Sequence, residues 1–571
     1  MSQEVLKRLL PFLGWPRLTR ETLLADLMAG LAVALLVIPQ SLAYAQLAGV
    51  PAQQGLYAAF IPSIIGVLFG SSALLSTGPV ALTSLLTASS VGLLTTPGTS
   101  EFVAYVLLVA LLSGLFQIML GLARAGILLN LLSHPVLVGF INAAAVVIAL
   151  SQLPALTGIA TSHGEGTLIG IGKMFTKIDT MHGMSLAMGL LAMLVLLAFK
   201  RWAPKQPGVL VMVVVLTALS YFSGFAAIGG GVVGDIPQGM PDWSVPAMSW
   251  DATVSLLPAA FVVALVSFME AMSSCKVIAG KTRSPWNENQ ELIGQGLAKV
   301  AAAFCNSMPV SGSFSRSALN LASHGRTGYS SLFTSAFVLL ALLFFTSLLY
   351  HLPKPALAAM IVLAVAKLVD VPAMRNAWRA SRDDGAAAWL TFAATLLFAP
   401  NIQNGILVGL TFSLGAFIYR RMMPKIAVHA VAQDGALLAL AAHSTAPRRD
   451  RVVALRFDAA LFFANASFFE DEVLKLEREN PGLEAIVVMA HGINLLDSTA
   501  VEMLRGLIKH LRERGIMLVF SRAKQQFLEV AERTGLLKEL GAANLFESDE
   551  EAMQAVLERA PKTAQPGIMA T

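Results

Sequence analysis

The stretch PVSGSFSRSALNLASH (residues 309–324) is short, interrupted by Pro, Gly and Ser, and flanked by long apolar runs. It contains Arg316, whose guanidinium stays charged in proteins. An arginine at bilayer depth costs about 2.5 kcal/mol or more. Such a charge requires a water-filled cavity, a carboxylate partner or an anionic ligand. The alternative is a kinked helix whose arginine extends to the membrane interface.

The composition of the chain is that of a membrane protein. Of its 571 residues, 56% are hydrophobic and 13% are charged, whereas a soluble domain carries about a quarter charged residues. The net charge of +5 does not indicate nucleic-acid binding, because the basic residues occur in short loops between apolar runs. Cys275 and Cys305 fit no disulfide or metal spacing, so we expect buried, unreactive thiols and no cofactor.

The apolar stretches predict about fourteen crossings or half-crossings of a membrane. Lys and Arg recur on every second connection, for example at Arg124, Lys200 and Arg420, and the alternate loops are poor in them. The positive-inside rule then places both termini in the cytoplasm, with an even number of crossings. The sequence therefore predicts a multi-pass α-helical membrane protein, and we expect it in a bacterial inner (plasma) membrane.

A second short segment, STGPVALTSLL (residues 76–86), is similar to the first in its length, its small residues and its glycine. Pro79 and Ser315 lie 236 positions apart, and Gln40 and Glu270, the main polar groups of two earlier spans, lie 230 apart. Paired interrupted segments in corresponding halves of a chain are typical of transporter binding sites. The spacing predicts two inverted halves.

A helix that begins at mid-membrane directs unpaired N–H groups and the positive end of its dipole into the cavity. Two such N-termini facing each other, one from each short segment, would form an anion site. Ser313 and Ser315 add hydroxyl donors, and Arg316 adds fixed positive charge. Gln40 and Tyr44 lie one helical turn apart and face the same way. This spacing predicts donors that line the cavity, with interhelical hydrogen bonding as the alternative.

Glu270 is the clearest carboxylate within a span. Two compatible roles are open to it. It is a counter-ion to Arg316, or it is a proton-titrating group whose charge is coupled to anion occupancy. His134, Asn142 and Asn306 are better explained as structural residues.

After residue 421 the composition changes to that of a soluble domain. The strand-like runs VVALRF, AIVVMA and IMLVFS alternate with amphipathic helical segments, which predicts a small α/β domain with some parallel strand pairing. Asp497 and Ser498 lie where one strand ends and a helix begins. Residues of these types there are most often N-caps. The alternative is a regulatory surface on which Ser498 is phosphorylated.

These patterns divide the chain into five segments, which differ in apolar content and in charge. They are a cytoplasmic interfacial segment at 1–20, the transmembrane domain at 21–422, a linker at 423–447, the α/β domain at 448–560 and a disordered tail at 561–571.

The run VIPQSLAYA, followed by PAQQGLYAAFIPSIIGVLFGSSALLSTGPVAL, resembles the signature of the sulfate permease (SulP) family of anion transporters. The later run NLLDSTAVEML resembles part of a STAS domain, and the resemblance covers nearly the whole chain. It implies fourteen segments in two inverted seven-segment repeats, with core and gate subdomains. It also implies elevator-like movement of the core, a homodimer and a cytoplasmic STAS domain.

The resemblance also implies roles for individual residues. Gln40 and Tyr44 match site positions of the first span, and Glu270 matches the carboxylate of the eighth. The starts of the two half-helices supply the other expected substrate-binding residues, which are Pro79, Val80 and Ala81 in the third segment and Ser313, Phe314, Ser315 and Arg316 in the tenth.

The chain departs from one branch of this family one turn after Glu270. Sodium-coupled bicarbonate transporters of the family have a second carboxylate there, whereas this chain has Ser274. The difference argues against sodium coupling and, weakly, against bicarbonate as substrate.

We therefore expect a proton-coupled secondary transporter that carries sulfate or a C4-dicarboxylate inward. One alternative is uncoupled or exchange transport of bicarbonate, chloride or oxalate. Another is a membrane anion sensor that signals through a cytoplasmic partner of the STAS domain. The STAS-like tail and Arg316 argue against a nucleobase permease. The sequence has no recognisable nucleophile–base or metal-ligand set, which argues against an enzyme.

Overall fold

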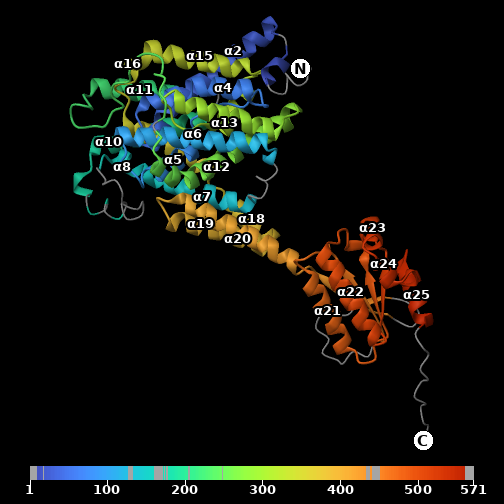
Figure 1. The fold of residues 1–571 in the computed structure, drawn as a ribbon. Helices are drawn as coiled ribbons and strands as arrows, with labels where there is room; N and C mark the ends of the chain where they lie inside the picture. Colours follow the sequence, from blue (N-terminus) through green and yellow to red (C-terminus); the bar gives the residue numbers. More distant parts are fainter. Residues whose placement is uncertain are drawn as a thin grey trace. The chain divides into compact units, whose positions relative to one another are not determined.

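The chain forms two compact units, Met1–Ser413 and Leu414–Thr571. The computed structural model describes residues 10–16, 18–126, 133–159, 172, 174, 176, 178–203, 206–246, 248–431, 437–439 and 451–559. The predicted disordered tail lies outside these residues. Helices dominate the first unit, and the second contains an α/β domain (Figure 1).

The helical unit repeats one order of elements. In each half a long helix, a further helical stretch, a two-residue strand and a short helix follow one another, and more helices complete the half. The first half contains η1 (Pro11–Gly14), α2 (Arg20–Ala48), α3 (Ala52–Ala58), α4 (Ile61–Phe69), β1 (Thr77–Gly78), α5 (Ala81–Val91), α6 (Ser100–Leu122), α7 (His134–Ser151), α8 (Leu153–Thr157), η3 (Ile178–Thr180), α10 (Gly183–Trp202) and α11 (Gly208–Phe222). The second half contains α12 (Trp250–Thr282), α13 (Glu288–Phe304), β2 (Ser311–Gly312), α14 (Phe314–Ala322), α15 (Tyr329–Leu340), η4 (Ala341–Phe345), α16 (Thr346–Leu349), α17 (Lys354–Val365), η5 (Ala366–Leu368), α18 (Val371–Ala380), α19 (Arg382–Leu397) and α20 (Ile402–Met422).

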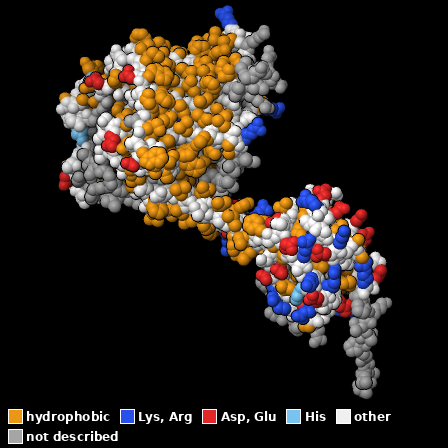
Figure 2. All heavy atoms as spheres, viewed as in Figure 1, with side chains coloured by type: hydrophobic (Ala, Val, Ile, Leu, Met, Phe, Trp, Pro, Cys, Tyr) orange, Lys and Arg blue, Asp and Glu red, His pale blue; other side chains and the backbone are white. Residues whose placement is uncertain are grey.

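Nine helical stretches among the described residues are long and apolar enough to span a membrane. They are Arg20–Ala48, Ala52–Phe69, Ser100–Leu122, His134–Thr157, Gly183–Trp202, Trp250–Thr282, Tyr329–Leu349, Lys354–Ala380 and Ile402–Met422. Figure 2 shows their apolar side chains as a broad band over this unit, with charged side chains at its margins. The multi-pass helical architecture is confirmed, and the number of fourteen crossings stays a prediction.

Local chemistry sets the ends of α2, the helix that carries Gln40. The Thr19 side chain accepts a hydrogen bond from Thr22 N, and the Thr22 side chain accepts one from Thr19 N. This reciprocal capping box satisfies two backbone donors at the start of the helix. Gly49, with φ of 74°, ends the helix in the left-handed conformation that favours glycine,.

The membrane helices pack in two groups, each drawn from both halves of the chain. In one group, α6 and α13 lie side by side (Figure 1), α4 packs against α13, and α2 packs against α15. In the other group, α7 packs against α19 and α10 against α17. The groups correspond to the core and gate subdomains that the resemblance implies.

The two short segments predicted to correspond meet in the core group. Strands β1 and β2 pair antiparallel, with Thr77 opposite Gly312 and Gly78 opposite Ser311. Helices α5 and α14, which follow them, have 11 and 9 residues, or about 17 and about 14 Å. Each is about half as long as the bilayer core is thick. Antiparallel pairing of corresponding segments is what an inverted repeat requires.

Each of these strands contains a glycine because its neighbours leave little room for a side chain. A Cβ atom on Gly78 would lie 3.1 Å from Nη2 of Arg316. A Cβ atom on Gly312 would lie 2.9 Å from Cβ of Ala271, the residue after Glu270. The two glycines therefore let the strand pair approach both the buried arginine and the helix of the buried carboxylate.

Asp26, a fully buried carboxylate near the start of α2, joins the two halves. Its Oδ1 accepts hydrogen bonds from Arg326 N (2.6 Å) and Thr327 N (3.1 Å), and its Oδ2 accepts one from the Thr327 hydroxyl (2.5 Å). All three donors belong to the turn before α15, so the carboxylate fixes that turn to α2.

We expect Asp26→Ala to destabilise the folded protein by about 3 kcal/mol or more, because it leaves two N–H groups and a hydroxyl without their acceptor. Thermal unfolding of the detergent-solubilised protein measures this loss. The matched control is Glu21→Ala, since the Glu21 side chain is 76% exposed and pairs with the Arg326 guanidinium at 2.7 Å. Such a surface pair contributes about 1 kcal/mol at most. Equal losses in the two variants would contradict the structural role of Asp26.

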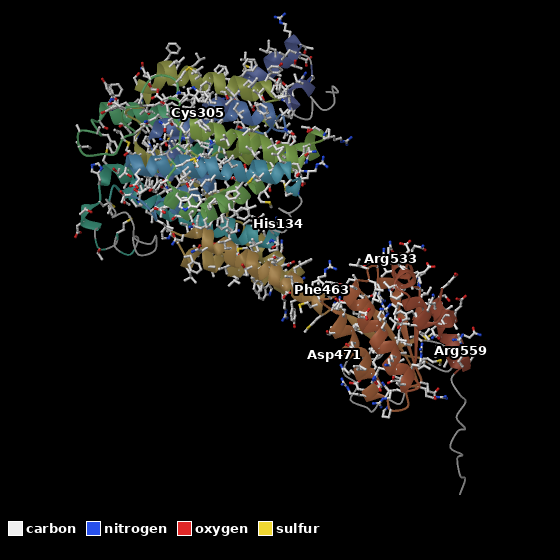
Figure 3. All side chains as sticks on the ribbon, in the orientation of Figure 1. His134, Cys305, Phe463, Asp471, Arg533 and Arg559 are labelled. Atoms are coloured by element: carbon white, nitrogen blue, oxygen red, sulfur yellow. The ribbon has the colours of Figure 1, made fainter. Side chains whose placement is uncertain are left out.

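The second unit contains a six-stranded sheet with the strand order β4-β3-β5-β6-β7-β8. Strands β5 to β8 are parallel, and β3 is antiparallel to both its neighbours. Its elements are β3 (Ile426–Val431), β4 (Leu437–Ala439), β5 (Val452–Phe457), α21 (Ala466–Glu479), β6 (Ala485–Met489), η6 (Ala490–Gly492), α22 (Ser498–Glu513), β7 (Met517–Ser521), α23 (Gln525–Arg533), α24 (Leu536–Leu540), η7 (Ala542–Asn544), β8 (Leu545–Phe546) and α25 (Asp549–Arg559). Figure 3 labels three charged residues on its helices, Asp471, Arg533 and Arg559.

The structure confirms the three predicted strands as β5, β6 and β7. It differs from the sequence prediction at residues 423–447, which were expected to form a linker. Within that segment β3 and β4 join the sheet, and β3 pairs with β5 over five residue pairs. Pairing satisfies backbone groups along the edge of β5. A six-residue strand next to a membrane helix has too weak a pattern for sequence alone to identify it.

Candidate functional site

The residues predicted to bind the anion lie on elements that contact one another. Gln40 and Tyr44 are on α2, Glu270 is on α12, and the remaining positions are at the starts of α5 and α14. Both α2 and α12 pack against α5 and against α14. The structure therefore brings the predicted positions together in one region of the core group.

The N-terminal turn of α14 is open to solvent. Ser313 is the N-cap, and its hydroxyl accepts a hydrogen bond from Arg316 N (3.5 Å). Phe314 is 53% exposed, and Ser315 is also exposed. The hydroxyl oxygens of Ser313 and Ser315 are 3.4 Å apart. The turn therefore presents a hydroxyl and the first backbone N–H groups of a helix to an accessible space.

The N-terminal turn of α5 is buried and has no side-chain cap. Val80 is the N-cap residue and supplies no side-chain hydrogen bond to the turn. Pro79 and Ala81 beside it are buried as well. Thr83, one turn further on, has a buried hydroxyl without a partner among the described residues. The positive end of this helix is therefore held in the protein interior without a side-chain acceptor.

Arg316 joins the two half-helices. Its Nη1 donates a hydrogen bond to the carbonyl of Pro79 (2.7 Å), and its Nε donates one to the hydroxyl of Ser76 (3.3 Å). Nη2 is buried and has no partner among the described residues. Two nitrogens of the guanidinium thus donate hydrogen bonds to the first short segment, and Nη2 remains available to donate to a ligand.

This geometry argues against two of the alternatives considered for Arg316, an arginine that extends to the membrane interface and one in a close ion pair. The side chain is 0% exposed, so it does not extend to the membrane interface. Its two bonded partners are a backbone carbonyl and a hydroxyl, and among the described residues no carboxylate lies within ion-pair distance of it. Glu270 interacts with Arg316 electrostatically but not as a close ion pair.

Glu270 differs from the other buried carboxylates in its hydrogen bonding. Its Oε2 is buried and has no partner among the described residues. By contrast, one oxygen of Glu291 accepts hydrogen bonds from Ser71 N (2.8 Å) and Ser72 N (3.0 Å). Asp26 is satisfied by backbone donors in the same way. Two of these carboxylates are therefore fixed structural acceptors, whereas one oxygen of Glu270 is left without a partner among the described residues.

Tyr44 lies near Arg316 and Glu270, and Gln40 lies one turn before it on α2. Gln40 is almost fully buried, and its Oε1 has no partner among the described residues. Tyr44, one turn later, interacts electrostatically with Arg316 and Glu270. Among these orphaned atoms, Nη2 of Arg316 is a donor that water or an anion can accept from, and the oxygens of Gln40 and Glu270 are acceptors that water can donate to,.

A cavity of about 330 Å³ opens onto this region. Its lining comes from α2 and α14 of the core group and from α10, α11, α17 and η5. The lining residues are Leu36, Gln40, Leu196, Leu197, Phe199, Lys200, Gln206, Gly208, Val209, Ser315, Met360, Leu363, Ala364 and Lys367. Two of them are lysines and none is acidic, so the lining favours an anion over a cation.

Lys299 on α13 is a second buried cation, which was not identified from the sequence. It is fully buried, and its Nζ lies 2.5 Å from the hydroxyl of Ser267 on α12. A lone lysine in an otherwise apolar run was the available signal. Lys299 was missed because glycines interrupt this apolar run, so that the run resembles a loop.

Two of the three residues expected to be structural, Asn142 and Asn306, have structural contacts, and the structural role of His134, which is exposed at the start of α7, stays a prediction. The Asn142 side chain accepts a hydrogen bond from Asp370 N (2.7 Å) and so fixes α7 to the start of α18. Gln54 Nε2 donates to Asn306 Oδ1 (3.4 Å). Figure 3 places Cys305 among the membrane helices, and both cysteines are buried and free. Among the described residues, no group of three or more His, Cys, Asp or Glu could hold a metal ion.

In the α/β domain Asp497 is the N-cap of α22. Its Oδ1 accepts a hydrogen bond from Ala500 N (2.9 Å), and its Oδ2 accepts one from Phe463 N (2.8 Å). Phe463, labelled in Figure 3, is 71% exposed, and Ser498 at the first position of the helix is also exposed. The capping role is confirmed, and the phosphorylation of Ser498 stays a prediction.

Comparison with known proteins agrees with this architecture. The family model described as the sulfate permease family matches residues 23–391, and the STAS domain model matches residues 443–552. A probable sulfate transporter 4.2 of Arabidopsis thaliana is 32% identical, with 93% of this chain and 80% of that protein covered. A probable sulfate transporter of Mycobacterium tuberculosis is 33% identical, with 95% and 96% covered.

Two solved structures share the fold at lower sequence identity. The murine anion transporter Slc26a9, solved in an inward-facing state, matches with a TM-score of 0.89 at 21% identity, over 98% of this chain and 95% of that chain. The transmembrane domain of the cyanobacterial bicarbonate transporter BicA matches with a TM-score of 0.59 at 22% identity, over 70% and 99%. These likenesses establish the fold, and the sequence matches establish the family. The chain belongs to the sulfate permease family of anion transporters and carries a STAS domain after its membrane domain.

Proposed function

We propose that the protein is a proton-coupled secondary transporter of a small anion, with sulfate or a C4-dicarboxylate as its substrate. The observation that carries this proposal is the cavity in which Gln40 meets the open N-terminal turn of α14, with two lysines and no acidic residue in its lining. Sulfate is favoured because the sequence relatives are named as sulfate transporters.

In this proposal the anion is held mainly by hydrogen-bond donors. The first N–H groups of α14 and the Ser315 hydroxyl bind it from one side. Gln40 and Tyr44 supply side-chain donors, and Nη2 of Arg316 is the available guanidinium nitrogen. The buried N-terminus of α5 contributes its dipole. A site made of partial charges can bind an anion and still release it on the other side of the membrane.

Glu270 provides the coupling to protons. Its ionised carboxylate lowers the positive potential that Arg316 creates, and protonation of the carboxylate restores that potential. A protonated Glu270 therefore favours a bound anion, and an ionised Glu270 favours release. Its buried Oε2, which has no hydrogen-bond partner among the described residues, supports this role, because that oxygen can take up a proton without breaking a hydrogen bond.

The packing of the helices supports elevator-type alternating access. The residues of the site are on α2, α5, α12 and α14, which pack together and are joined by the β1–β2 pair and Arg316. The opposite wall of the cavity comes largely from α10, α11 and α17. Movement of the first group past the second would carry the site from one side of the membrane to the other.

The proposal extends to the setting in which the protein works. It includes a homodimer in a bacterial inner membrane, with both termini in the cytoplasm, and a cytoplasmic partner at the STAS surface around Asp497 and Ser498. The alternation of basic and non-basic loops supports this orientation. The exposure of Ser498 beside the α22 N-cap supports an accessible regulatory surface.

The test is uptake of a panel of labelled anions into proteoliposomes with an imposed inward proton gradient. We expect sulfate or a C4-dicarboxylate to accumulate about tenfold per pH unit for each coupled proton, since a tenfold concentration ratio and one pH unit are equal free energies. Dissipation of the gradient with an ionophore is the control. Flux that does not depend on the proton gradient would show uncoupled transport. Flux that requires internal chloride, bicarbonate or oxalate would show exchange. Binding without any flux would show a sensor.

A further inference from the structure

We propose that Lys299 sets the valence of the transported anion, by supplying a second positive charge that matches the site to a divalent anion. This inference rests on the proposed function, because it assumes that the anion binds between α5 and α14. It concerns a residue on α13 that lies behind the site. Lys299 is therefore a positioning residue that acts through its electric field and not by contact with the anion.

Lys299 is a buried cation without a close counter-ion. Its side chain is fully buried in α13, and its described hydrogen bond is to the Ser267 hydroxyl (2.5 Å). Glu291, two turns earlier on the same helix, is engaged by backbone donors of Ser71 and Ser72. Among the described residues no carboxylate lies within ion-pair distance of Lys299. A buried ammonium without compensation is strongly unfavourable, so an anion bound in the site would stabilise its charged form.

Ser267 links Lys299 to both elements of the site. Its hydroxyl donates to Val263 O (2.5 Å) and accepts from Lys299 and from Gln117 Nε2 (3.1 Å). Its backbone carbonyl accepts a hydrogen bond from the Ser311 hydroxyl (2.7 Å). Ser311 is in β2, just before α14. Ser267 is also three residues before Glu270, and so lies next to it on the surface of α12.

The charges at the site do not cancel. Arg316 contributes one positive charge, Lys299 contributes a second when its amine is protonated, and Glu270 contributes one negative charge when it is ionised. Glu270 interacts electrostatically with both cations. The remaining buried carboxylates, Asp26 and Glu291, are stabilised separately by backbone donors. With Lys299 protonated, the site therefore has a net charge of +1 when Glu270 is ionised and +2 when Glu270 is protonated.

The other ionisable residues on the helices around α13 do not change the net charge of the site. The helices packed against α13 are α4, α6 and α12. Their ionisable residues are Glu101 and Tyr105 on α6 and Asp251, Glu270, Cys275, Lys276 and Lys281 on α12. Of these described residues, Glu270 is the charged partner of Lys299. The protonated site is consequently neutralised by a divalent anion, and a monovalent anion leaves it with excess charge.

The expected effect of removing Lys299 follows from Coulomb's law. The attraction between an anion and a fixed charge is proportional to the valence of the anion. If the loss of one positive charge weakens binding of a monovalent anion about tenfold, it weakens binding of a divalent anion about a hundredfold. The preference for sulfate over chloride then falls about tenfold. A packing defect would weaken the binding of both anions alike.

The experiment compares sulfate and chloride in three variants of Lys299. Lys299→Gln removes the charge and keeps a donor for Ser267, Lys299→Met removes both, and Lys299→Arg keeps the charge. For each we would measure the KM of uptake into proteoliposomes and, separately, the stabilisation of the detergent-solubilised protein by each anion. We expect the sulfate preference to fall about tenfold with Gln and with Met, and to remain with Arg. Lys276→Gln, which removes an exposed lysine of α12, is the matched control and should keep the preference.

The two measurements separate this inference from the proposed function. If the wild type shows no flux but its stabilisation by sulfate is lost selectively in Lys299→Gln, the transport proposal fails and the inference stands. Equal losses for sulfate and chloride would overturn the inference, as would a preference lost in Lys299→Arg. The absence of stabilisation by either anion in the wild type would also overturn it. If one neutral variant does not fold, the comparison is made with the other. If neither neutral variant folds but Lys299→Arg does, the charge of Lys299 has a structural role and the inference is overturned.

Discussion

Replacement of Glu270 by glutamine is expected to abolish the dependence of anion accumulation on the pH gradient while anion binding persists. Glutamine has nearly the shape of a protonated glutamate and carries no charge, so the variant holds the site in its anion-binding form. Accumulation should fall from about tenfold per pH unit for each coupled proton to no response to the gradient. Proteoliposomes with imposed gradients of several sizes measure the slope.

The control for this prediction is Asp251→Asn, which removes an exposed carboxylate near the start of the same helix. This variant should retain the wild-type slope. Exchange of labelled for unlabelled anion should continue in Glu270→Gln, since exchange needs no change in protonation. A Glu270→Gln protein that accumulates anion with the full slope would refute the coupling role of this carboxylate.

Replacement of Arg316 by alanine is expected to lower the transport rate about a hundredfold or more and to weaken anion binding without abolishing it. The variant loses the hydrogen bonds to the Pro79 carbonyl and the Ser76 hydroxyl that join the two half-helices. Hydrogen bonds made by a charged group contribute about 1.5–3 kcal/mol each. Anion binding persists because the N–H groups of α14 remain. Initial uptake rates and anion-dependent thermal stabilisation measure the two effects.

Two further variants test whether the effect comes from the hydrogen bonds by which Arg316 joins the half-helices. Arg316→Lys keeps the charge but has a single nitrogen, which cannot replace two nitrogens of the guanidinium, so we expect intermediate transport. Arg326→Ala removes an exposed arginine and should have little effect. Complete loss of anion binding in a folded Arg316→Ala protein would show that the arginine itself is the anion site.

The sequence predicts the short paired segments because their composition carries the signal. A glycine among small residues, at corresponding positions of two halves, indicates a half-helix, and in the structure the two segments meet through the β1–β2 pair, which was not itself predicted. Strands β5, β6 and β7 of the second unit were predicted for a similar reason, since apolar, β-branched runs alternate with amphipathic helices. Glu270 was found because a carboxylate in a long apolar run is conspicuous.

The partners of the buried charges could not be predicted in the same way. The main acceptor for Arg316 is the backbone carbonyl of Pro79, and every residue type has such a carbonyl. The hydrogen bonds that Glu291 accepts from backbone N–H groups cannot be predicted from the sequence either, for the same reason. The gate side of the cavity is lined by apolar residues such as Leu196 and Met360, which have the composition of any membrane helix.

The pairing of β1 with β2 also constrains how the protein is made. The paired residues are more than 230 positions apart, so a ribosome has completed the first half long before the partner strand of β1 exists. Until then the start of α5 lacks its neighbour, and a long loop must close before the contact forms. Neither half can then mature alone, and chains that stop before β2 should be recognised by membrane proteases as incomplete. The duplicated halves of this transporter have become one unit of biogenesis.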